Sequence, residues 1–188
     1  MNRLLKSTLV TLLATAALAG HAQQKLLPAQ SEILFVSRQM GVPVEGRFKK
    51  FDAQISFDTA KLDASKVAFS VDIGSATLGA PEPDAELPKP AWFNVAKFPQ
   101  ATFTSSAIKA LGGGKFEVAG KLAIKGQTRD VVVPVSMVQA GAVTTASGAL
   151  PIKRLAFHIG EGEWADTSTV ADDVQIKFKF ALSGVGKL

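Results

Sequence analysis

His158 is the side chain best suited to acid–base chemistry in this sequence, because the only other histidine, His21, lies in an N-terminal leader. A Ser–His–Asp hydrolase would have to use His158 as its base. A zinc site would need further His or Cys ligands, and the sequence has no cysteine. Apolar side chains lie opposite His158 within residues 155–159, which is typical of a structural or surface histidine. We therefore predict neither a catalytic residue nor a metal site.

Two further segments have the composition of ion-binding loops but not the spacing. Residues 160–173 are rich in carboxylates, which calcium prefers, yet their spacing fits no EF-hand loop. The triple glycine at residues 112–114 is not followed by the Lys-Ser/Thr pair of a phosphate-binding loop. We predict a solvated acidic loop, with Trp164 as an anchor at its rim, and a hairpin turn at the glycines.

Basic side chains near the aromatic motifs are candidates for binding a phosphate-containing head group, because their charge strengthens hydrogen bonds to phosphate oxygens. Arg47 and Lys97 are preferred, since each adjoins an aromatic residue. The alternative is that these side chains belong to the ordinary solvated surface. The complete candidate set is Arg47, Lys49, Lys50, Lys97 and Arg129.

The first 22 residues have the pattern of a secretory signal peptide. A short basic start and an apolar run precede two small-x-small cleavage sites. The apolar run is too short to span a bilayer comfortably, and no cysteine follows it for lipid attachment. We predict cleavage after Ala22, with Ala19 as the alternative, which leaves residues 23–188 as a single exported domain.

The composition excludes several classes of protein. An exported chain without cysteine forms no disulfides and has no thiolate metal ligands or cysteine nucleophile. The charge of +5 becomes about +3 when Arg3 and Lys6 leave with the signal peptide. No run of Lys and Arg is longer than two residues, so the sequence gives no support for nucleic-acid binding.

Period-two alternation of apolar and polar residues dominates the rest of the chain and predicts strands with one buried face. Residues 42–58 form either one long, bent strand or a tight strand pair, with Gly46 interrupting the pattern. Residues 155–159 could add a short strand. We predict an all-β fold, an eight-stranded antiparallel barrel rather than a sandwich, with room for one small ligand. The strands are expected at residues 31–38, 42–58, 66–74, 101–108, 115–125, 129–139, 142–154 and 174–183.

Residues 79–99 differ from the rest of the chain because they contain five of its nine prolines. Such a density excludes a central strand and permits at most a short helix near residues 84–87. The segment also contains Trp92, Phe93 and Phe98, which argue against disorder. We predict a Pro-rich loop with a short helix that packs on the sheet as a lid.

A series of short motifs runs through residues 31–183. The motifs are Gly46-Arg47-Phe48 with Phe51, Phe57-Asp58, Trp92-Phe93-Asn94, Lys97-Phe98-Pro99, Phe103-Thr104-Ser105, Val118-Ala119-Gly120-Lys121-Leu122 with Gly126, and Asp172-Asp173-Val174. In their order and spacing they resemble the YceI-like family of exported lipid-binding proteins. The resemblance implies a lipocalin-like barrel in the periplasm whose pore holds a polyisoprenoid chain, such as a quinone or a polyprenyl phosphate, with no established catalysis. It also implies di-haem membrane cytochromes of the b type as candidate partners, since some relatives are linked to them.

The aromatic composition suits such a pore, because the chain has twelve Phe, two Trp and no Tyr. Phenylalanine offers apolar surface without a hydroxyl that needs a partner. The alternative is that these rings fill a solid core. We predict ligand contacts from Phe48, Phe57, Phe69, Phe103, Phe116, Ile124, Phe178 and Phe180, with Trp92, Phe93 and Phe98 in the lid.

Three functions are compatible with these observations. The favoured one is a carrier for an isoprenoid lipid, acting as a monomer or homodimer with transient contact to a membrane surface. The second is a quinone-loaded accessory to a b-type membrane cytochrome. The third is a lipid-modifying enzyme, for which His158 would be the residue to test and which the lone histidine disfavours.

Overall fold

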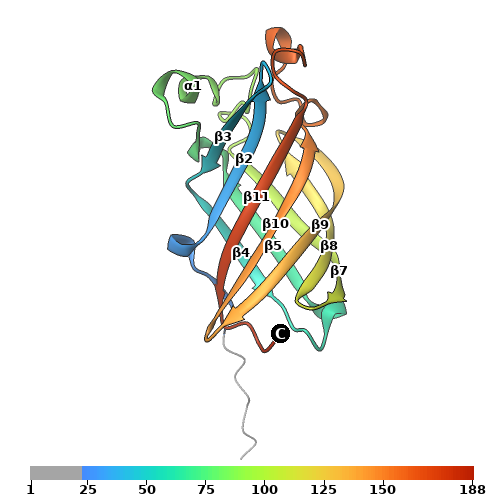
Figure 1. Cartoon of the computed structure of the whole chain (residues 1–188). Coiled ribbons are helices and arrows are strands. Elements are labelled where there is room, and N and C mark those ends of the chain that lie inside the picture. Colours follow the sequence, from blue (N-terminus) through green and yellow to red (C-terminus); the bar gives the residue numbers. More distant parts are fainter. Residues whose placement is uncertain (1–22) are drawn as a thin grey trace, which may run out of the picture.

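The structure, a computed structural model, describes residues 23–188, and the predicted signal peptide lies outside this range. The described chain is an antiparallel sheet that curls round on itself (Figure 1), and its interior is apolar. Its helical parts are α1 (Pro81–Glu86) and the 3₁₀ turns η1 (Pro28–Gln30), η2 (Leu62–Ala64), η3 (Ile73–Ser75), η4 (Arg154–Phe157) and η5 (Gly162–Ala165). The strands are β1 (Lys25–Leu26), β2 (Glu32–Gln39), β3 (Val42–Phe48), β4 (Phe51–Ser56), β5 (Lys66–Asp72), β6 (Ala76–Thr77), β7 (Gln100–Gly112), β8 (Lys115–Ile124), β9 (Gln127–Ala140), β10 (Val143–Lys153) and β11 (Asp173–Ser183).

The sheet follows the chain from neighbour to neighbour, as predicted for an up-and-down arrangement. Its order is β4-β5-β7-β8-β9-β10-β11-β2-β3-β6. The last strand returns to the first long one, with Phe178 opposite Ile33 in the antiparallel ladder between β11 and β2. The all-β antiparallel fold is therefore confirmed.

A bend at Lys49 and Lys50 separates β3 from β4 and sends the two halves to different neighbours. β3 pairs with β2, whereas β4 pairs with β5. The Ser75 hydroxyl accepts hydrogen bonds from the backbone N–H groups of Lys49 and Lys50, at 3.1 and 3.0 Å. Of the two alternatives predicted for residues 42–58, the long, bent strand is confirmed. The tight strand pair is wrong, because β3 and β4 pair with other strands and not with each other.

The predicted strand count differs from the observed one for simple reasons. Residues 23–188 contain eleven strands rather than eight. Two of them, β1 and β6, are only two residues long, and β3 and β4 are the halves of one predicted strand. The predicted strand at residues 155–159 is wrong, because η4 occupies most of this segment and His158 is left-handed with φ 57°.

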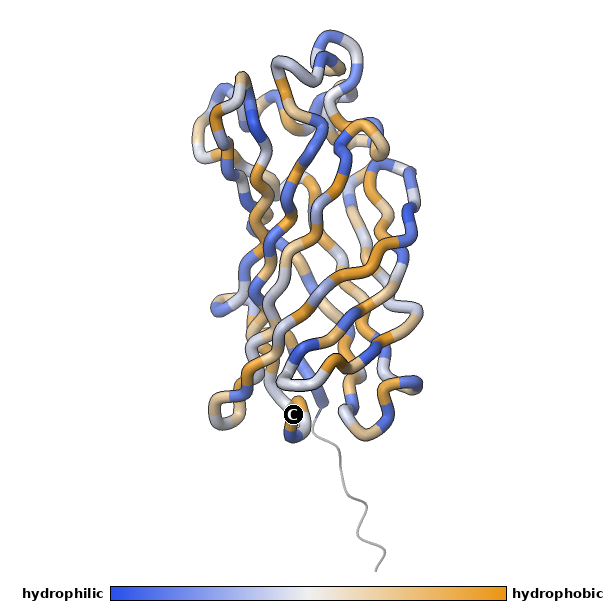
Figure 2. The backbone as a smooth tube through the Cα atoms, turned by 45° about the vertical axis from the view of Figure 1, so that its right-hand side comes forward, coloured by the Kyte–Doolittle hydropathy of each residue, from blue (hydrophilic) through white to orange (hydrophobic). Residues whose placement is uncertain are grey.

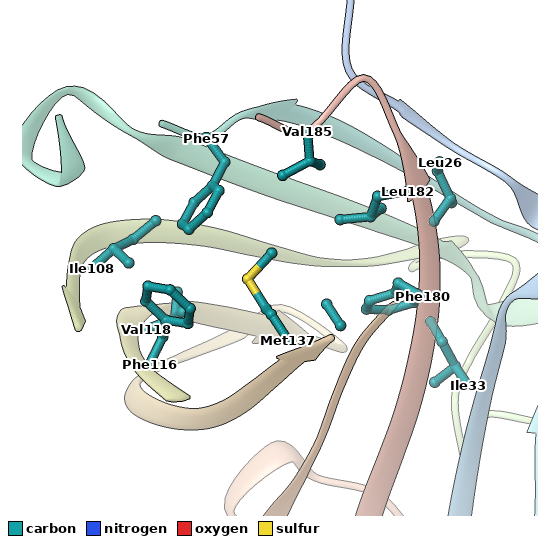
Figure 3. Packing of buried hydrophobic residues seen from close by; sticks show 11 residues of the cluster. Leu26, Ile33, Phe57, Ile108, Phe116, Val118, Met137, Phe180, Leu182 and Val185 are labelled. Carbon is teal, nitrogen blue, oxygen red and sulfur yellow. The ribbon is translucent and has the colours of Figure 1, made fainter. Parts of the chain in front are cut away.

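Hydrophobic and hydrophilic residues alternate along parts of the strands, as the orange and blue segments of the tube show (Figure 2). The apolar members of this alternation are the buried ones, for example Phe116, Val118 and Leu122 in β8. The buried residues form two clusters. One lies at the end of the sheet where the chain terminates, and its side chains, among them Phe57, Phe116, Met137 and Leu182, point toward one another (Figure 3). The other, which includes Leu87, Phe93, Leu150 and Ile159, lies beneath the lid. No helix within residues 23–188 is long and apolar enough to cross a membrane.

Candidate ligand-binding cavity

A cavity of about 250 Å³ lies inside the curled sheet. Its wall includes residues of both buried clusters, from Met137 and Leu182 near the chain termini to Leu87 and Ile159 beneath the lid. The cavity is therefore elongated along the strands. Nearly all of the side chains that line it are aliphatic or aromatic, so the wall offers shape rather than hydrogen bonds.

Ten of the eleven residues predicted to contact a ligand line this cavity, and their binding of a ligand stays a prediction. The exception is Phe98, whose ring lies beside Gly126 in the turn between β8 and β9. The ammonium group of Lys97 lies over this ring, 5.3 Å from its centre. The placement of Phe98 does not support its prediction as a ligand contact, and the sequence could not indicate this because loop residues have no period that tells which way they face. The ten are Phe48, Phe57, Phe69, Trp92, Phe93, Phe103, Phe116, Ile124, Phe178 and Phe180.

Three rings of the wall lie over glycines of neighbouring strands. A Cβ atom at Gly46 would be 2.2 Å from the Phe35 ring, and one at Gly148 would be 2.6 Å from the Phe178 ring. The third ring, Phe103, covers Gly120 in the same way. A glycine in a strand allows such a close approach, and the ring covers the exposed backbone. The rings thus lie along the wall instead of filling the interior.

Gly148→Ala is expected to destabilise the protein. The added methyl group would be 2.3 Å from the backbone oxygen of Pro134 as well as close to Phe178. Overpacking of this kind costs about 1–3 kcal/mol, or roughly 2–12 °C in Tm for a domain of this size. Calorimetry of the variant measures the shift. Gly186→Ala is the control, since a methyl group there would meet nothing beyond its chain neighbours within 4 Å, and an equal Tm for both variants would contradict the close approach.

The lid, residues 79–99, closes one end of the cavity, as predicted. Its Leu87 and Phe93 side chains are buried and line the cavity together with Trp92. Asp84 in α1 anchors it, because its carboxylate accepts hydrogen bonds from the Thr77 hydroxyl and from a backbone N–H group. These hydrogen bonds hold the pKa of Asp84 below its usual value, and the bond from Thr77 has the largest effect.

A second set of contacts, here called the latch, joins the lid to the loop after β10. The buried Lys125 ammonium group donates to the backbone oxygen of Pro90 at 2.8 Å and to the Glu161 carboxylate at 3.1 Å. His158 donates through Nδ1 to the same carboxylate at 2.7 Å. The backbone N–H of Glu161 donates to the oxygen of Ala91. His158 therefore has a structural contact in this arrangement.

The latch is expected to loosen in acid. Hydrogen bonds from His158 and then from Lys125 lower the pKa of Glu161 below 4.5, its usual value. A carboxylate with a lowered pKa stabilises the fold at pH values above its unfolded pKa, and this contribution is lost as the pH falls through the folded one. Hydrogen exchange of the Gly160 and Glu161 amides, corrected for intrinsic rates, should lose protection below about pH 4.5.

The matched variant for this measurement is Glu161→Gln, which has no carboxylate to protonate. Its Gly160 and Glu161-position amides should be less protected at neutral pH, with little further change on acidification. Two results would contradict a role for Glu161 in holding the latch. One is that the wild-type amides keep full protection from hydrogen exchange down to pH 3, and the other is that the variant loses protection in acid as the wild type does.

Arg154, buried to 2% exposure, lines the lid end of the cavity and is absent from the residues that the sequence predicts. Its guanidinium group donates to five backbone oxygens at 2.7–3.1 Å, and burial lowers its pKa. One feature of the sequence indicates that Arg154 faces inward: it lies two residues after Ile152, which lines the cavity, and side chains two apart in a strand share a face. The local chain curls around the guanidinium group, which explains why residues 155–159 do not extend as a strand. The five acceptors are Ile159, Gly160, Trp164, Val170 and Ala171.

The basic residues predicted to meet a head group do not line the cavity. Arg47 and Lys97 are exposed, and Arg47 lines a separate pocket near the bend together with Lys49 and Lys50. Arg129 donates to the backbone oxygen of Ala156 at 2.9 Å on the outside of the sheet. Their role in binding a head group stays a prediction that this placement does not support.

The acidic loop and the triple glycine take structural positions. Asp166 accepts hydrogen bonds from Ser168, and Asp172 accepts one from the backbone of Leu155. Trp164 packs on Trp92 with ring centres 5.4 Å apart, as expected for an anchor. Residues 112–114 join β7 to β8 in a hairpin. Within the described residues, no group of three or more His, Cys, Asp and Glu side chains could hold a metal ion.

A curled antiparallel sheet around an elongated apolar cavity, closed by a lid at one end, defines a lipocalin-like protein. Residues 25–182 match the YceI-like domain, and the chain belongs to this family. The resemblance stated from the sequence is thereby confirmed.

Relatives and solved structures agree with this assignment. A UPF0312 protein of Azotobacter vinelandii is 32% identical over 146 residues, covering 73% of this chain and 76% of the relative. The crystal structure of BcnA from Burkholderia cenocepacia is 49% identical, with a TM-score of 0.80 over 83% of this chain and 98% of BcnA. A polyisoprenoid binding domain from Saccharophagus degradans, 18% identical, shares the fold with a TM-score of 0.69 over 87% of this chain and 99% of that domain.

Proposed function

We propose that this protein is an exported periplasmic carrier that holds a long-chain isoprenoid lipid inside the curled sheet. The observation that carries the proposal is the elongated apolar cavity, whose wall runs from the lid to the opposite cluster. A branched hydrocarbon needs a dry, shaped surface and few hydrogen bonds. The Saccharophagus domain, described as polyisoprenoid binding, has the same fold, so the fold is compatible with this class of ligand.

Energetics favour a carrier over a permanent cofactor site. Burying one five-carbon isoprene unit from water gains about 4 kcal/mol, at about 0.8 kcal/mol per carbon. Eight units would exceed the practical affinity limit of roughly 18–21 kcal/mol. The competing state is the membrane rather than water, so transfer from bilayer to cavity changes the free energy little. Loading and release are then both feasible.

The experiment that tests this proposal is mass spectrometry of organic extracts from protein purified from its native host. We expect a polyisoprenoid at close to one molecule per chain. A preparation that is folded, contains no lipid and takes none up from vesicles would overturn the proposal. An isoprenoid quinone in the extract, with a b-type cytochrome that co-purifies, would extend it to the electron-transfer accessory.

The turn between β2 and β3 is the surface we assign to transient membrane contact. Met40 and Val42 are 78% and 63% exposed there, and the turn contacts the loop at Thr169 near the lid end of the cavity. Exposed apolar side chains at one tip can enter the boundary between lipid head groups and acyl chains.

The double variant Met40→Ser/Val42→Ser is expected to slow lipid transfer from vesicles about tenfold, because two apolar side chains no longer enter the bilayer. Stopped-flow measurement of the transfer rate checks this. Leu111→Ser is the control, since Leu111 is also apolar, is 52% exposed and lies in the last residues of β7, at the opposite end of the sheet. Equal slowing by both variants would contradict docking through the lid end.

A further inference from the structure

The wall of the curled sheet has a seam where β3 and β4 part. The ladder between β2 and β3 ends at the pair Ile33 and Phe48, and the bend at residues 49–50 then directs β4 toward β5. β4 is the first strand of the sheet, and its other edge has no ladder partner among residues 23–188. Because only full closure removes the edges of a sheet, the backbone ladder does not seal the wall here.

A pocket, here called the wedge, occupies this seam and adjoins the cavity. It is lined by residues 28 and 31–34 on one wall and by residues 47–51 on the other. Ile33 and Phe48 line both the wedge and the cavity, so their side chains form part of the partition between the two spaces. Phe48 packs against both buried clusters, so the wedge meets the cavity near the middle of its length.

Each wall of the wedge is held by hydrogen bonds on its own side. On one wall, the Ser31 hydroxyl donates to the oxygen of Leu27 at 2.8 Å and accepts from the N–H of Ala181 at 2.9 Å. On the other wall, the bend is bonded to Ser75. Within the described chain, no backbone hydrogen bond joins residues 28–32 to residues 49–51. Parting the walls at this point therefore breaks none, whereas opening a laddered pair breaks a row of them.

The other candidate route, through the lid, is closed by hydrogen bonds. Lys125 and Glu161 of the latch bond the lid at one side, and Asp84 anchors it at the other. Toward the chain termini the seam is also closed, because the side-chain amide of Gln24 bonds the backbone of Phe57 at 2.6 and 2.7 Å. The wedge is thus the part of the wall that opens with the fewest bonds broken.

Basic side chains surround the outer mouth of the wedge. Arg47, Lys49 and Lys50 are exposed, and none of the three is in an ion pair among the residues that the structure describes. Glu32 is the one acidic residue that lines this pocket. The mouth therefore carries a net positive charge, which attracts the phosphates of an anionic bilayer.

We infer that the wedge is a lateral entrance through which the isoprenoid chain passes between a bilayer and the cavity. The inference rests on the proposed function and adds the route of the ligand. The basic mouth contacts the phosphates of anionic phospholipids and holds the wedge against the bilayer. The hairpin of β2 and β3 connects this mouth to the exposed Met40 and Val42, so a molecule lying with the hairpin on the bilayer presents both.

Plugging the wedge tests the route, and the absence of cysteine from the chain permits a single attachment point. Glu32→Cys, labelled with fluorescein maleimide, places the plug in the wedge. Glu163→Cys with the same label is the matched control, because Glu163 is an exposed glutamate of η5 at the lid end. Octaprenyl benzoquinone is delivered from a cyclodextrin complex, so no membrane contact is involved. Mass spectrometry follows the lipid per chain over time.

The plug at position 32 should slow loading about tenfold or more relative to the same variant before labelling, as an added barrier of roughly 1.4 kcal/mol gives. The plug at position 163 should slow it less than about twofold. Lys50→Cys attaches the plug to the other wall and should give the same result, which keeps the test decisive if Glu32→Cys does not fold. If plugs in the wedge slow loading no more than the plug at position 163 does, the lateral entrance is overturned.

Transfer from vesicles tests the basic mouth. Lys49→Gln/Lys50→Gln should load about tenfold more slowly than the wild type from vesicles of phosphatidylcholine with phosphatidylglycerol, because each basic residue near an anionic surface contributes about fivefold. The difference should vanish with phosphatidylcholine alone. Lys109→Gln/Lys115→Gln removes the same charge from exposed positions of β7 and β8 and is the control. Equal slowing by both double variants would overturn the contact of this mouth with the bilayer.

The outcomes distinguish the inference from the proposed function. A failed plug or vesicle measurement overturns the entrance or its contact with the bilayer, while the carrier function stands because the lipid still loads. Folded, unlabelled wild-type protein that takes up neither the quinone nor octaprenyl alcohol, from cyclodextrin or from vesicles, would overturn the carrier function itself.

Discussion

Val135→Trp is expected to abolish lipid loading while leaving the protein folded. Val135 lines the cavity from β9 and packs against both buried clusters, so an indole there fills the middle of the elongated space. Overpacking costs about 1–3 kcal/mol in a filled core, and the open cavity should reduce this cost. Bound lipid per chain, measured by mass spectrometry after loading from vesicles, should fall more than about tenfold, which corresponds to roughly 1.4 kcal/mol.

Val132→Trp is the matched control, because Val132 lies three residues earlier on the same strand and is 57% exposed. It introduces the same side chain on the outer face of the sheet and should load normally. Circular dichroism and Tm establish that both variants are folded. Normal loading by a folded Val135→Trp variant would show that the ligand binds elsewhere, and the cavity would then be a packing feature.

The barrel-like fold could be predicted because each long strand carries its own signal. Inward positions repeat at period two in segments such as β11, where Ile176 and Phe178 alternate with lysines, and this pattern needs no knowledge of neighbours. The lid was predictable for a different reason, since five prolines exclude a strand while Trp92 and Phe93 require burial. The signals are local in both cases.

The details of the cavity depend on contacts between distant segments, which a local pattern does not contain. Phe35 covers Gly46 only because the register between β2 and β3 places them opposite each other. The acceptors of Arg154 come from residues 159–171, a loop without periodicity. Ser37 occupies an inward position that the alternation does indicate, but its lack of a partner is visible only in the folded chain.

The largest loss of stability is expected from Arg154→Ala. The substitution leaves five backbone oxygens without their donor, and these oxygens hold η4, η5 and the segment before β11 around one point. Each buried polar group left unpaired costs about 1–3 kcal/mol, less where water enters. We expect the free energy of unfolding to fall by about 4 kcal/mol, a Tm lower by roughly 8–16 °C.

Lys153→Ala is the control for Arg154→Ala, because it removes the preceding basic residue, which is 58% exposed and pairs with Asp173 on the surface. Such a surface ion pair contributes about 0–1 kcal/mol. Arg154→Lys should fall between the two, since an ammonium group keeps the charge but supplies only three donors where the guanidinium supplies five. If Arg154→Ala melts within a degree of Lys153→Ala, the loop is held by other contacts and Arg154 does not organise it.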